Sequence, residues 1–317
     1  MKILALSGFV PEQICDTVRF TRYTGDRNIT HYCGYASDYI SRVLNDPAID
    51  GAVFPKTCDS ARILPSYLAG SGKFCYQLAV PAGRTPEAVG YFAGRIKAFQ
   101  QAVEAHYGIR IQDIPQRIIR LNERNRRIRE IYDQVSLYSY ADYLQAIHSL
   151  MEMPLAQQQW PDHIERQAPT ENRVFLVGSF LSCMQIAREI SRAGLTVVGD
   201  TLPESGRLLS AGPVDPAAEP YRAIAENILS RRLSPTQNDF REILTRDLSE
   251  IRTKKAKGVV FVTQKYCEPY DYLYAAYKKE LDLCGIPSVK ISPSHSEDPG
   301  KALLLLETFA DMLKGED

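Results

Sequence analysis

Three of the seven cysteines, Cys33, Cys58 and Cys267, stand in the same kind of local sequence. Cys58 and Cys267 each follow a run of apolar residues, GAVFP and GVVFVT, and each precedes a stretch with the pattern of a helix. Cys33 lies in HYCGYASDYI, just ahead of another such stretch. A helix N-terminus presents free N–H groups and a partial positive charge, which lowers the pKa of a thiol and stabilises bound anions. Thiolates in such positions are candidate ligands of a soft-metal site.

The spacing of these cysteines leaves an inert role open as the alternative. Gaps this wide form no local metal-binding motif, and the absence of CxxC and His-x-x-His pairs argues against a zinc finger. An odd number of cysteines without an export signal argues against a disulfide framework and favours the cytoplasm. The other cysteines fall inside apolar or helical runs and are expected to be core thiols: Cys15, Cys75, Cys183 and Cys284.

Several polar residues near these segments have two interpretations each. Glu12, in PEQI after the first apolar run, is a candidate proton-transferring residue, with a carboxylate in the first turn of a helix as the alternative. His31 is a candidate hydrogen-bond donor beside Cys33 or a loop residue. Asp59 and Glu268 are interpreted as first-turn residues that favour a helix N-terminus. Packing is expected for a group of tyrosines near the third cysteine: Tyr266, Tyr270, Tyr272, Tyr274 and Tyr277.

Short apolar runs alternate with helical patterns in the first and last thirds of the chain. The runs predict buried strands at residues 2–6, 51–55, 74–80, 173–178, 195–198, 258–263 and 288–291. Helices are predicted at 38–44, 60–69, 181–193, 271–284 and 300–314. This alternation is typical of open parallel sheets, in which ligands bind beyond the carboxyl ends of the strands. The loops that carry the three cysteines are expected at these ends.

A chain of 317 residues is too long for one ordinary core, so two domains are expected. Residues 85–148 have the pattern of long helices, and residues 154–170 are polar and read as a linker. The predicted fold class is α/β, with two Rossmann- or flavodoxin-like domains that contain parallel sheets. Residues 1–108 and 169–317 form these domains, residues 109–168 form the joining helical segment, and the candidate site lies in the cleft between the domains.

The charge balance excludes some classes of partner. Lys plus Arg and Asp plus Glu both number 38, so no overall field favours nucleic acid or an anionic membrane. The basic helix RIIRLNERNRRIREIYDQV contains interleaved acidic residues, and a solvated helix face explains it better than nucleic-acid contact. No stretch reaches the length of a membrane-spanning helix, so neither nucleic acid nor a membrane is an expected partner.

An ordered series of segments resembles the D-component of the 2-hydroxyacyl-CoA dehydratase family, which includes benzoyl-CoA reductase subunits and double-cubane cluster proteins. The resemblance covers nearly the whole chain. It is carried by GFVPEQI, DGAVFPKTCDSAR, FCYQLAVP, YFAGRIKAF, IIRLNERNRRIREIYD, GLTVVGD followed by SGR, GVVFVTQKYCEPYDY and GIPSVKI.

The resemblance implies a [4Fe–4S] cluster on Cys33, Cys58 and Cys267, with one iron open to substrate. Two of these cysteines come from the first domain and one from the second, so the cluster would bridge the cleft. In this family an ATP-hydrolysing activator supplies one low-potential electron, and an acyl-CoA thioester is reduced to a ketyl radical that expels a neighbouring group. The chain has no GxxxxGK[ST] motif, which agrees with ATP chemistry on a partner.

Three alternatives stay open. A homodimer could join two half-sites into an [8Fe–9S] double cubane and act as an ATP-dependent reductase of small molecules. The chain could be a non-catalytic, cluster-binding accessory subunit. It could also be an α/β binding protein without a cluster. The expected partners are the activator, an identical or related subunit, and an acyl-CoA or other small-molecule substrate.

Overall fold

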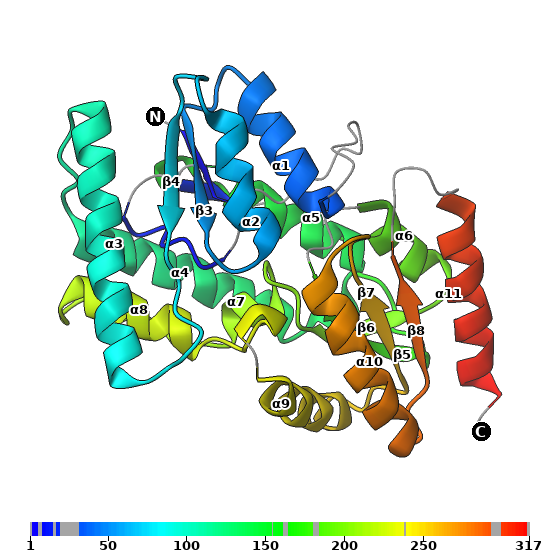
Figure 1. Cartoon of the computed structure of the whole chain (residues 1–317). Coiled ribbons are helices and arrows are strands. Elements are labelled where there is room, and N and C mark those ends of the chain that lie inside the picture. The colour runs from blue at the N-terminus through cyan, green and yellow to red at the C-terminus, as the bar shows by residue number, and fades with distance from the viewer. Residues whose placement is uncertain are drawn as a thin grey trace.

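The computed structural model describes residues 2–5, 8–14, 17–19, 32–153, 155–160, 164–179, 184–237, 239–292 and 299–315. Within these residues the strands form two four-stranded sheets, in the orders β2-β1-β3-β4 and β6-β5-β7-β8, and every pairing is parallel. Figure 1 shows the two sheets with helices around each of them. The predicted α/β fold class with parallel sheets is therefore confirmed.

The first sheet is covered by helices on both faces. Its strands are β1 (Ile3–Ala5), β2 (Thr17–Arg19), β3 (Gly51–Pro55) and β4 (Phe74–Leu78). Successive side chains of a strand point to opposite faces. In β3, Ala52 and Phe54 accordingly pack in one core, and Val53 packs in the other. This explains why GAVFP is a continuous apolar run, as is typical of a central parallel strand.

Three helical segments cover one face of the first sheet, and two helices cover the other. The first group is α1 (Gly34–Asn45), α2 (Asp59–Ile63) and the 3₁₀ helix η1 (Leu64–Leu68). The second is α3 (Pro86–Tyr107) and α8 (Pro220–Ser230), which lie side by side in Figure 1. The Thr85 side chain caps α3 at one end, and Gly108 ends it in the left-handed conformation with φ 64°, which glycine adopts readily.

The second sheet has the same layered construction. Its strands are β5 (Arg173–Gly178), β6 (Thr196–Asp200), β7 (Gly258–Val262) and β8 (Ser288–Ile291). One core holds side chains of α5 (Tyr140–Met151), α6 (Met184–Arg192) and α11 (Pro299–Lys314). The other holds side chains of α9 (Phe240–Thr253) and α10 (Glu268–Leu283). The central strand β7 is buried along its whole length.

Two helices connect the cores of the two sheets. The first half of α4 (Ile114–Tyr132) places Ile118 in the core of the first sheet, and its second half places Ile128 in a core of the second. Helix α8 follows β6 in the sequence, but its residues Ile224 and Ile228 pack in the core of the first sheet. The chain thus returns to the first sheet after entering the second. The domain boundaries at residues 108 and 168 stay a prediction.

Several helices begin earlier than the apolar pattern predicts. Helix α1 starts at Gly34 instead of residue 38, and α10 starts at Glu268 instead of residue 271. The first turn of a helix needs few apolar contacts, so periodicity misses it. The predicted helix at 60–69 divides into α2 and η1, with Pro65 in the first turn of η1, because proline cannot donate the backbone hydrogen bond that would continue the helix.

The remaining elements include two that the sequence analysis does not predict, β2 and the short helix α7 (Gly206–Leu209). Strand β6 continues through Gly199 to Asp200, two residues beyond the predicted end. None of the described helices is long and apolar enough to cross a membrane.

Candidate thiol site between the two sheets

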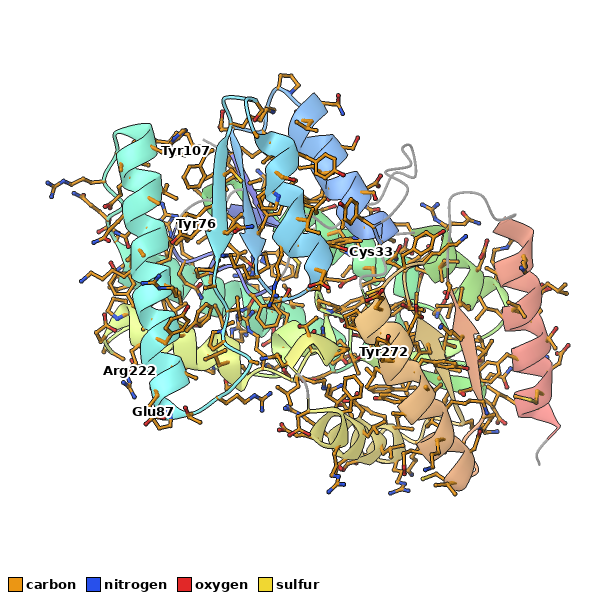
Figure 2. All side chains as sticks on the ribbon, in the orientation of Figure 1. Cys33, Tyr76, Glu87, Tyr107, Arg222 and Tyr272 are labelled. Atoms are coloured by element: carbon orange, nitrogen blue, oxygen red, sulfur yellow. The ribbon has the colours of Figure 1, made fainter. Side chains whose placement is uncertain are left out.

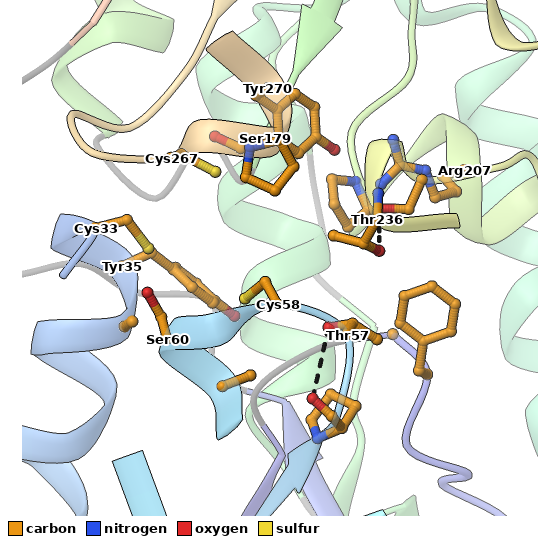
Figure 3. A pocket seen from close by; sticks show the side chains of 18 of the residues that line it. Cys33, Tyr35, Thr57, Cys58, Ser60, Ser179, Arg207, Thr236, Cys267 and Tyr270 are labelled. Atoms are coloured by element: carbon orange, nitrogen blue, oxygen red, sulfur yellow. Dashed lines mark hydrogen bonds between the residues drawn. The ribbon is translucent and has the colours of Figure 1, made fainter. Parts of the chain in front are cut away.

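The three candidate cysteines occupy the same position relative to three helices. Cys33 is the N-cap residue of α1, Cys58 that of α2, and Cys267 that of α10. All three line one cavity of about 120 Å³, and Figure 3 shows their sulfur atoms turned toward it. The structure therefore brings together residues that are far apart in the sequence.

The cavity lies where the carboxyl ends of the strands of both sheets meet. The first sheet contributes Gly8 after β1 and Cys58 after β3, whereas the second contributes Ser179 after β5 and Cys267 after β7. This is the edge at which open parallel sheets bind ligands. The position agrees with the expectation drawn from the sequence.

The thiols of Cys33 and Cys267 lie close enough to shift each other's pKa in opposite directions. The neighbouring thiol of Cys267 lowers the pKa of Cys33, and the backbone N–H groups of Ala36 and Tyr35 lower it further, although burial opposes them. The thiol of Cys33, together with burial, raises the pKa of Cys267 well above its usual value. The ionisation of either thiol therefore affects the other.

The thiol of Cys58 lies close enough to the other two thiols for charge on one to affect the pKa of another. Burial raises its pKa, the backbone N–H groups of Ala61 and Ser60 oppose this increase, and the charge of Cys33 adds to it. Backbone N–H groups in the first turn of the following helix lower the pKa of each of the three thiols, and for Cys267 this group is the N–H of Tyr270. Such donors stabilise thiolates and the anionic groups that thiolates bind.

The donor set suits a cluster better than a single metal ion. In the described part of the chain no group of three or more His, Cys, Asp or Glu side chains is arranged to hold one ion. The thiolates of an iron–sulfur cluster bind different iron atoms, so they do not have to converge on one point. Three soft sulfur donors around a shared cavity, each at the N-terminus of a helix, fit such a cluster.

The turn before Cys267 has an unusual backbone conformation. Tyr266 adopts φ 66°, and its side chain is 58% exposed. A non-glycine residue in the left-handed region is strained, and such strain gathers at functional sites. The turn is closed by the hydrogen bond from Cys267 N–H to the carbonyl of Gln264, with an N···O distance of 3.0 Å. Together these features direct the Cys267 side chain toward the cavity.

Glu12 lies in a buried ion pair and does not line the cavity. Its Oε2 is 2.5 Å from Nη1 of Arg124 on α4, and the two side chains are 9% and 5% exposed. Glu12 is part of the turn at residues 11–14, so the alternative of a helix first turn is wrong. A role in proton transfer stays a prediction. Asp59 and Glu268 do lie in the first turns of their helices.

The expectation of core thiols is wrong for two of the four remaining cysteines. Cys75 is exposed because β4 is the edge strand of its sheet, and Cys284 is half-buried at the end of α10. The expectations for Cys15, Cys183 and His31 concern residues outside those that the structure describes. Among the predicted packing tyrosines, Tyr270 and Tyr277 are buried, whereas Tyr266 and Tyr272 are largely exposed.

Three arginines line the cavity that sequence reasoning did not single out: Arg207, Arg231 and Arg232. The first is in the SGR segment, and the other two form a pair at the end of a helical stretch. Nη1 of Arg231 donates to the carbonyl of Gly8 over an N···O distance of 2.8 Å, which ties α8 to the loop after β1. In the sequence, the arginine pair stands at the end of a helical stretch, just before a Ser-Pro turn. This pattern alone does not indicate that the arginines line a cavity.

Comparisons with known proteins point to one family. A family model described as 2-hydroxyglutaryl-CoA dehydratase, D-component, matches residues 2–313. A benzoyl-CoA reductase subunit from Thauera aromatica is 25% identical over 297 residues, which cover 84% of this chain and 75% of that protein. The beta subunit of (R)-phenyllactyl-CoA dehydratase from Clostridium sporogenes is 25% identical over 143 residues, which cover 44% of this chain and 38% of that protein.

Proposed function

Since the chain belongs to the 2-hydroxyglutaryl-CoA dehydratase D-component family, we propose that it is the iron–sulfur subunit of a 2-hydroxyacyl-CoA dehydratase-like lyase. It is an enzyme subunit of the dehydratase or reductase type, as its relatives are. In the proposal Cys33, Cys58 and Cys267 hold a [4Fe–4S] cluster. A separate ATP-dependent activator supplies one electron, and the substrate is an acyl-CoA.

One observation carries this proposal. Thiols from positions 33, 58 and 267 line the same cavity, and each precedes the first turn of a helix. Packing in a core would not explain why all three thiols line one cavity and also stand directly before a helix. When bound, such a cluster would supply a low-potential electron and an open iron that acts as a Lewis acid.

The residues of the chain have defined tasks in this proposal. The backbone N–H groups in the first turns of α1, α2 and α10 stabilise negative charge on the sulfurs. The lining of the cavity is mostly apolar and includes Phe9, Leu208 and Ile228, so it limits the access of water to the site. Arg207 and Arg231 also line the cavity and add positive charge to it.

The partner subunit and the compartment are part of the same proposal. Both relatives are named as subunits of larger enzymes, which supports an identical or related partner chain. The described cysteines are free thiols, and free thiols persist in the reducing cytoplasm. We therefore place the protein there.

The proposal is tested by anaerobic purification and reconstitution of the full chain with iron and sulfide. The iron and sulfide content and the visible absorption of the wild type should show a cluster. Cys58→Ser and Cys267→Ser should lose most of the iron. Cys75→Ser and Cys284→Ser are the matched controls, since these thiols lie outside the cavity, and both should retain it. A wild type without iron, or equal iron in all four variants, would contradict the proposal.

The same measurement separates a single from a double cubane. A [4Fe–4S] cluster contains iron and sulfide in equal amounts, whereas an [8Fe–9S] cluster contains an excess of sulfide. Size-exclusion chromatography on the loaded protein distinguishes a homodimer from a chain that needs a different subunit. A loaded chain that shows no turnover with its activator and any related subunit would be the accessory protein.

A further inference from the structure

Two buried hydroxyl groups line the cavity that the three thiols share, those of Ser179 and Tyr270. The two residues are 5% and 6% exposed, and neither hydroxyl has a hydrogen-bond partner among the described residues. The guanidinium of Arg207 lies 6.0 Å from the centroid of the Tyr270 ring, but a guanidinium contains no acceptor for a hydroxyl proton. A buried hydroxyl without an acceptor is unfavourable, and a bound ligand that supplies one removes the penalty.

Other hydroxyls of the same cavity find acceptors within the protein. The Thr57 hydroxyl donates to the carbonyl of Pro55 over an O···O distance of 3.5 Å, and the Thr236 hydroxyl donates to that of Ser234 over 3.1 Å. Both threonines line the cavity. A missing acceptor is therefore not a general property of the lining.

The two hydroxyls without an acceptor belong to the carboxyl edge of the second sheet. Ser179 directly follows β5, and its N–H donates to the carbonyl of Val262 on β7 over an N···O distance of 3.0 Å. Tyr270 lies in the first turn of α10, and its N–H donates to the carbonyl of Cys267 over 3.1 Å. Figure 3 shows both side chains on the side of the cavity that carries Cys267, across from Cys33. Regular elements thus hold both donors in place, as preorganised binding requires.

The charged groups around Tyr270 favour an uncharged acceptor over an anion. Burial raises the pKa of Tyr270, the buried carboxylate of Glu204 adds to this rise, and the charge of Arg207 opposes it. Burial also raises the pKa of Asp247, and the charges of Arg232 and Arg207 oppose that rise. Positive and negative groups of the chain therefore already act on one another here, so a further anion is not needed for charge balance.

A carbonyl oxygen is a neutral acceptor that suits two donors. It has two lone pairs, so it can accept one hydrogen bond from each hydroxyl. Phe9, Leu208 and Ile228 are among the apolar residues of the lining and suit the hydrocarbon part of such a ligand. In the proposed reaction the carbonyl oxygen gains negative charge when the thioester accepts one electron, and O–H donors that are fixed in place stabilise that charge.

We infer that Ser179 and Tyr270 bind the carbonyl oxygen of the acyl thioester in this cavity. The inference deepens the proposed function and rests on it, because it assigns two residues that orient the substrate at the same site. From the sequence, Tyr270 is expected only to pack, and Ser179 is not singled out.

Isothermal titration calorimetry on the anaerobically reconstituted full-length protein compares two probes. Butanoyl-CoA contains the thioester carbonyl, whereas S-butyl-CoA has a CH₂ group in its place, and neither probe carries a hydroxyl group that could be expelled. The wild type should bind the thioester about 5- to 100-fold more tightly, the gain typical of two neutral hydrogen bonds. Equal binding of the two probes, or binding of neither, would overturn the inference.

Four single variants and one double variant assign the preference to the two hydroxyls. Ser179→Ala and Tyr270→Phe should each reduce the preference for the thioester about 2- to 10-fold, and the double variant should bind both probes about equally. Ser191→Ala is the matched control, because Ser191 on α6 also has a buried hydroxyl without a described partner but does not line the cavity. Tyr272→Phe is the other control, since Tyr272 is 68% exposed on α10 (Figure 2). An undiminished preference in the double variant would overturn the inference.

Infrared difference spectroscopy gives a second readout that does not depend on affinity. With a carbon-13 label at the carbonyl of butanoyl-CoA, the carbonyl stretch of the bound probe should lie at a lower frequency in the wild type than in Ser179→Ala or Tyr270→Phe, because hydrogen bonds weaken the C=O bond. A merely structural role of the two residues would lower the affinity without moving this band. The same frequency in the wild type and in both variants would overturn the inference.

Iron and sulfide content separates failure of this inference from failure of the proposed function. Ser179→Ala and Tyr270→Phe should both retain the wild-type iron content, and loss of iron from either would assign its hydroxyl to the cluster and overturn the inference. Equal binding of the two probes by an iron-loaded wild type would overturn the inference alone. A wild type that prefers the thioester through both hydroxyls but never holds iron would leave the inference standing and remove the proposed function.

Discussion

Single residues at the site are defined by what surrounds them more than by their type. Cys33 and Cys75 are both thiols near the first sheet, but Cys33 precedes a helix and faces a cavity, whereas Cys75 lies exposed on an edge strand. The neighbouring thiol of Cys267 lowers the pKa of Cys33, whereas the pKa of Cys267 in the same cavity is raised well above its usual value. The acidity of a thiol therefore depends on its immediate neighbours.

The buried pair between Glu12 and Arg124 provides a prediction at this scale. Removing one partner leaves an uncompensated buried charge, so Glu12→Ala should lower the free energy of unfolding by about 3–5 kcal/mol. Glu123→Ala is the control, because Glu123 pairs with Arg126 and Arg127 on the surface of α4, and it should change that free energy much less than Glu12→Ala does. Urea unfolding measures both values.

The Glu12 variant also separates a structural role from proton transfer. If Glu12 only balances Arg124, the folded Glu12→Gln protein should keep its iron content and its turnover. A large loss of turnover at wild-type stability would instead support the predicted role in proton transfer.

At the scale of elements, parallel strands bring the site together and close backbone contacts set its shape. Gly178 ends β5 directly before Ser179 of the cavity, and a Cβ there would lie 1.8 Å from the carbonyl oxygen of Val262 on β7. Strands β5 and β7 pair through this position. Any larger residue must push apart the two strands whose carboxyl ends carry Ser179 and Cys267.

Gly178→Ala is therefore expected to be destabilising, by about 1–3 kcal/mol or more, as overpacking usually is. Gly94→Ala is the matched control, because Gly94 lies inside α3 with no atom within 4 Å of an added Cβ. Alanine favours a helix, so this variant should gain about 0.5–1 kcal/mol. Thermal unfolding monitored by circular dichroism measures both changes, and destabilisation of equal size would contradict this account of the contact at Gly178.

At the scale of the whole molecule, the candidate site joins the two sheets. Cys33 and Cys58 belong to the first sheet and Cys267 to the second, and Arg231 on the chain after α8 holds Gly8 after β1. Helix α4 places residues in the cores of both sheets. Helix α8 follows a strand of the second sheet but packs in the core of the first. A group bound at all three thiols would therefore link the two halves.

If the proposed cluster links the two sheets, removal of its iron by chelation should increase local opening next to both sheets at the same time. Hydrogen exchange should become at least about tenfold faster at the amides of Ala36, Ala61 and Tyr270, which lie in the first turns of the helices after the three cysteines. Amides of α3, which does not line the cavity, should change little. Faster exchange near Ala36 and Ala61 alone would show that the group does not bridge the two sheets.

The sequence by itself determined the class of fold and singled out the three cysteines that line one cavity in the structure. Continuous apolar runs such as GAVFP and GVVFVT arise because a central parallel strand is buried on both faces, so the strands were predictable. A cysteine between such a strand and a helix must lie at the carboxyl end of the sheet, so Cys58 and Cys267 were predictable as neighbours of a ligand crevice.

Only the tertiary structure decided which residues from separate segments meet. The SGR segment and the arginine pair at 231–232 have no local pattern that indicates a shared cavity. The sequence also does not predict that α8 packs against the first sheet. An amphipathic pattern shows that a helix has an apolar face, but not which surface this face covers. Burial and pairing depend on contacts between distant segments. These contacts give Arg232 ion pairs with Asp247 and Glu250, whereas Arg207 forms none among the described residues.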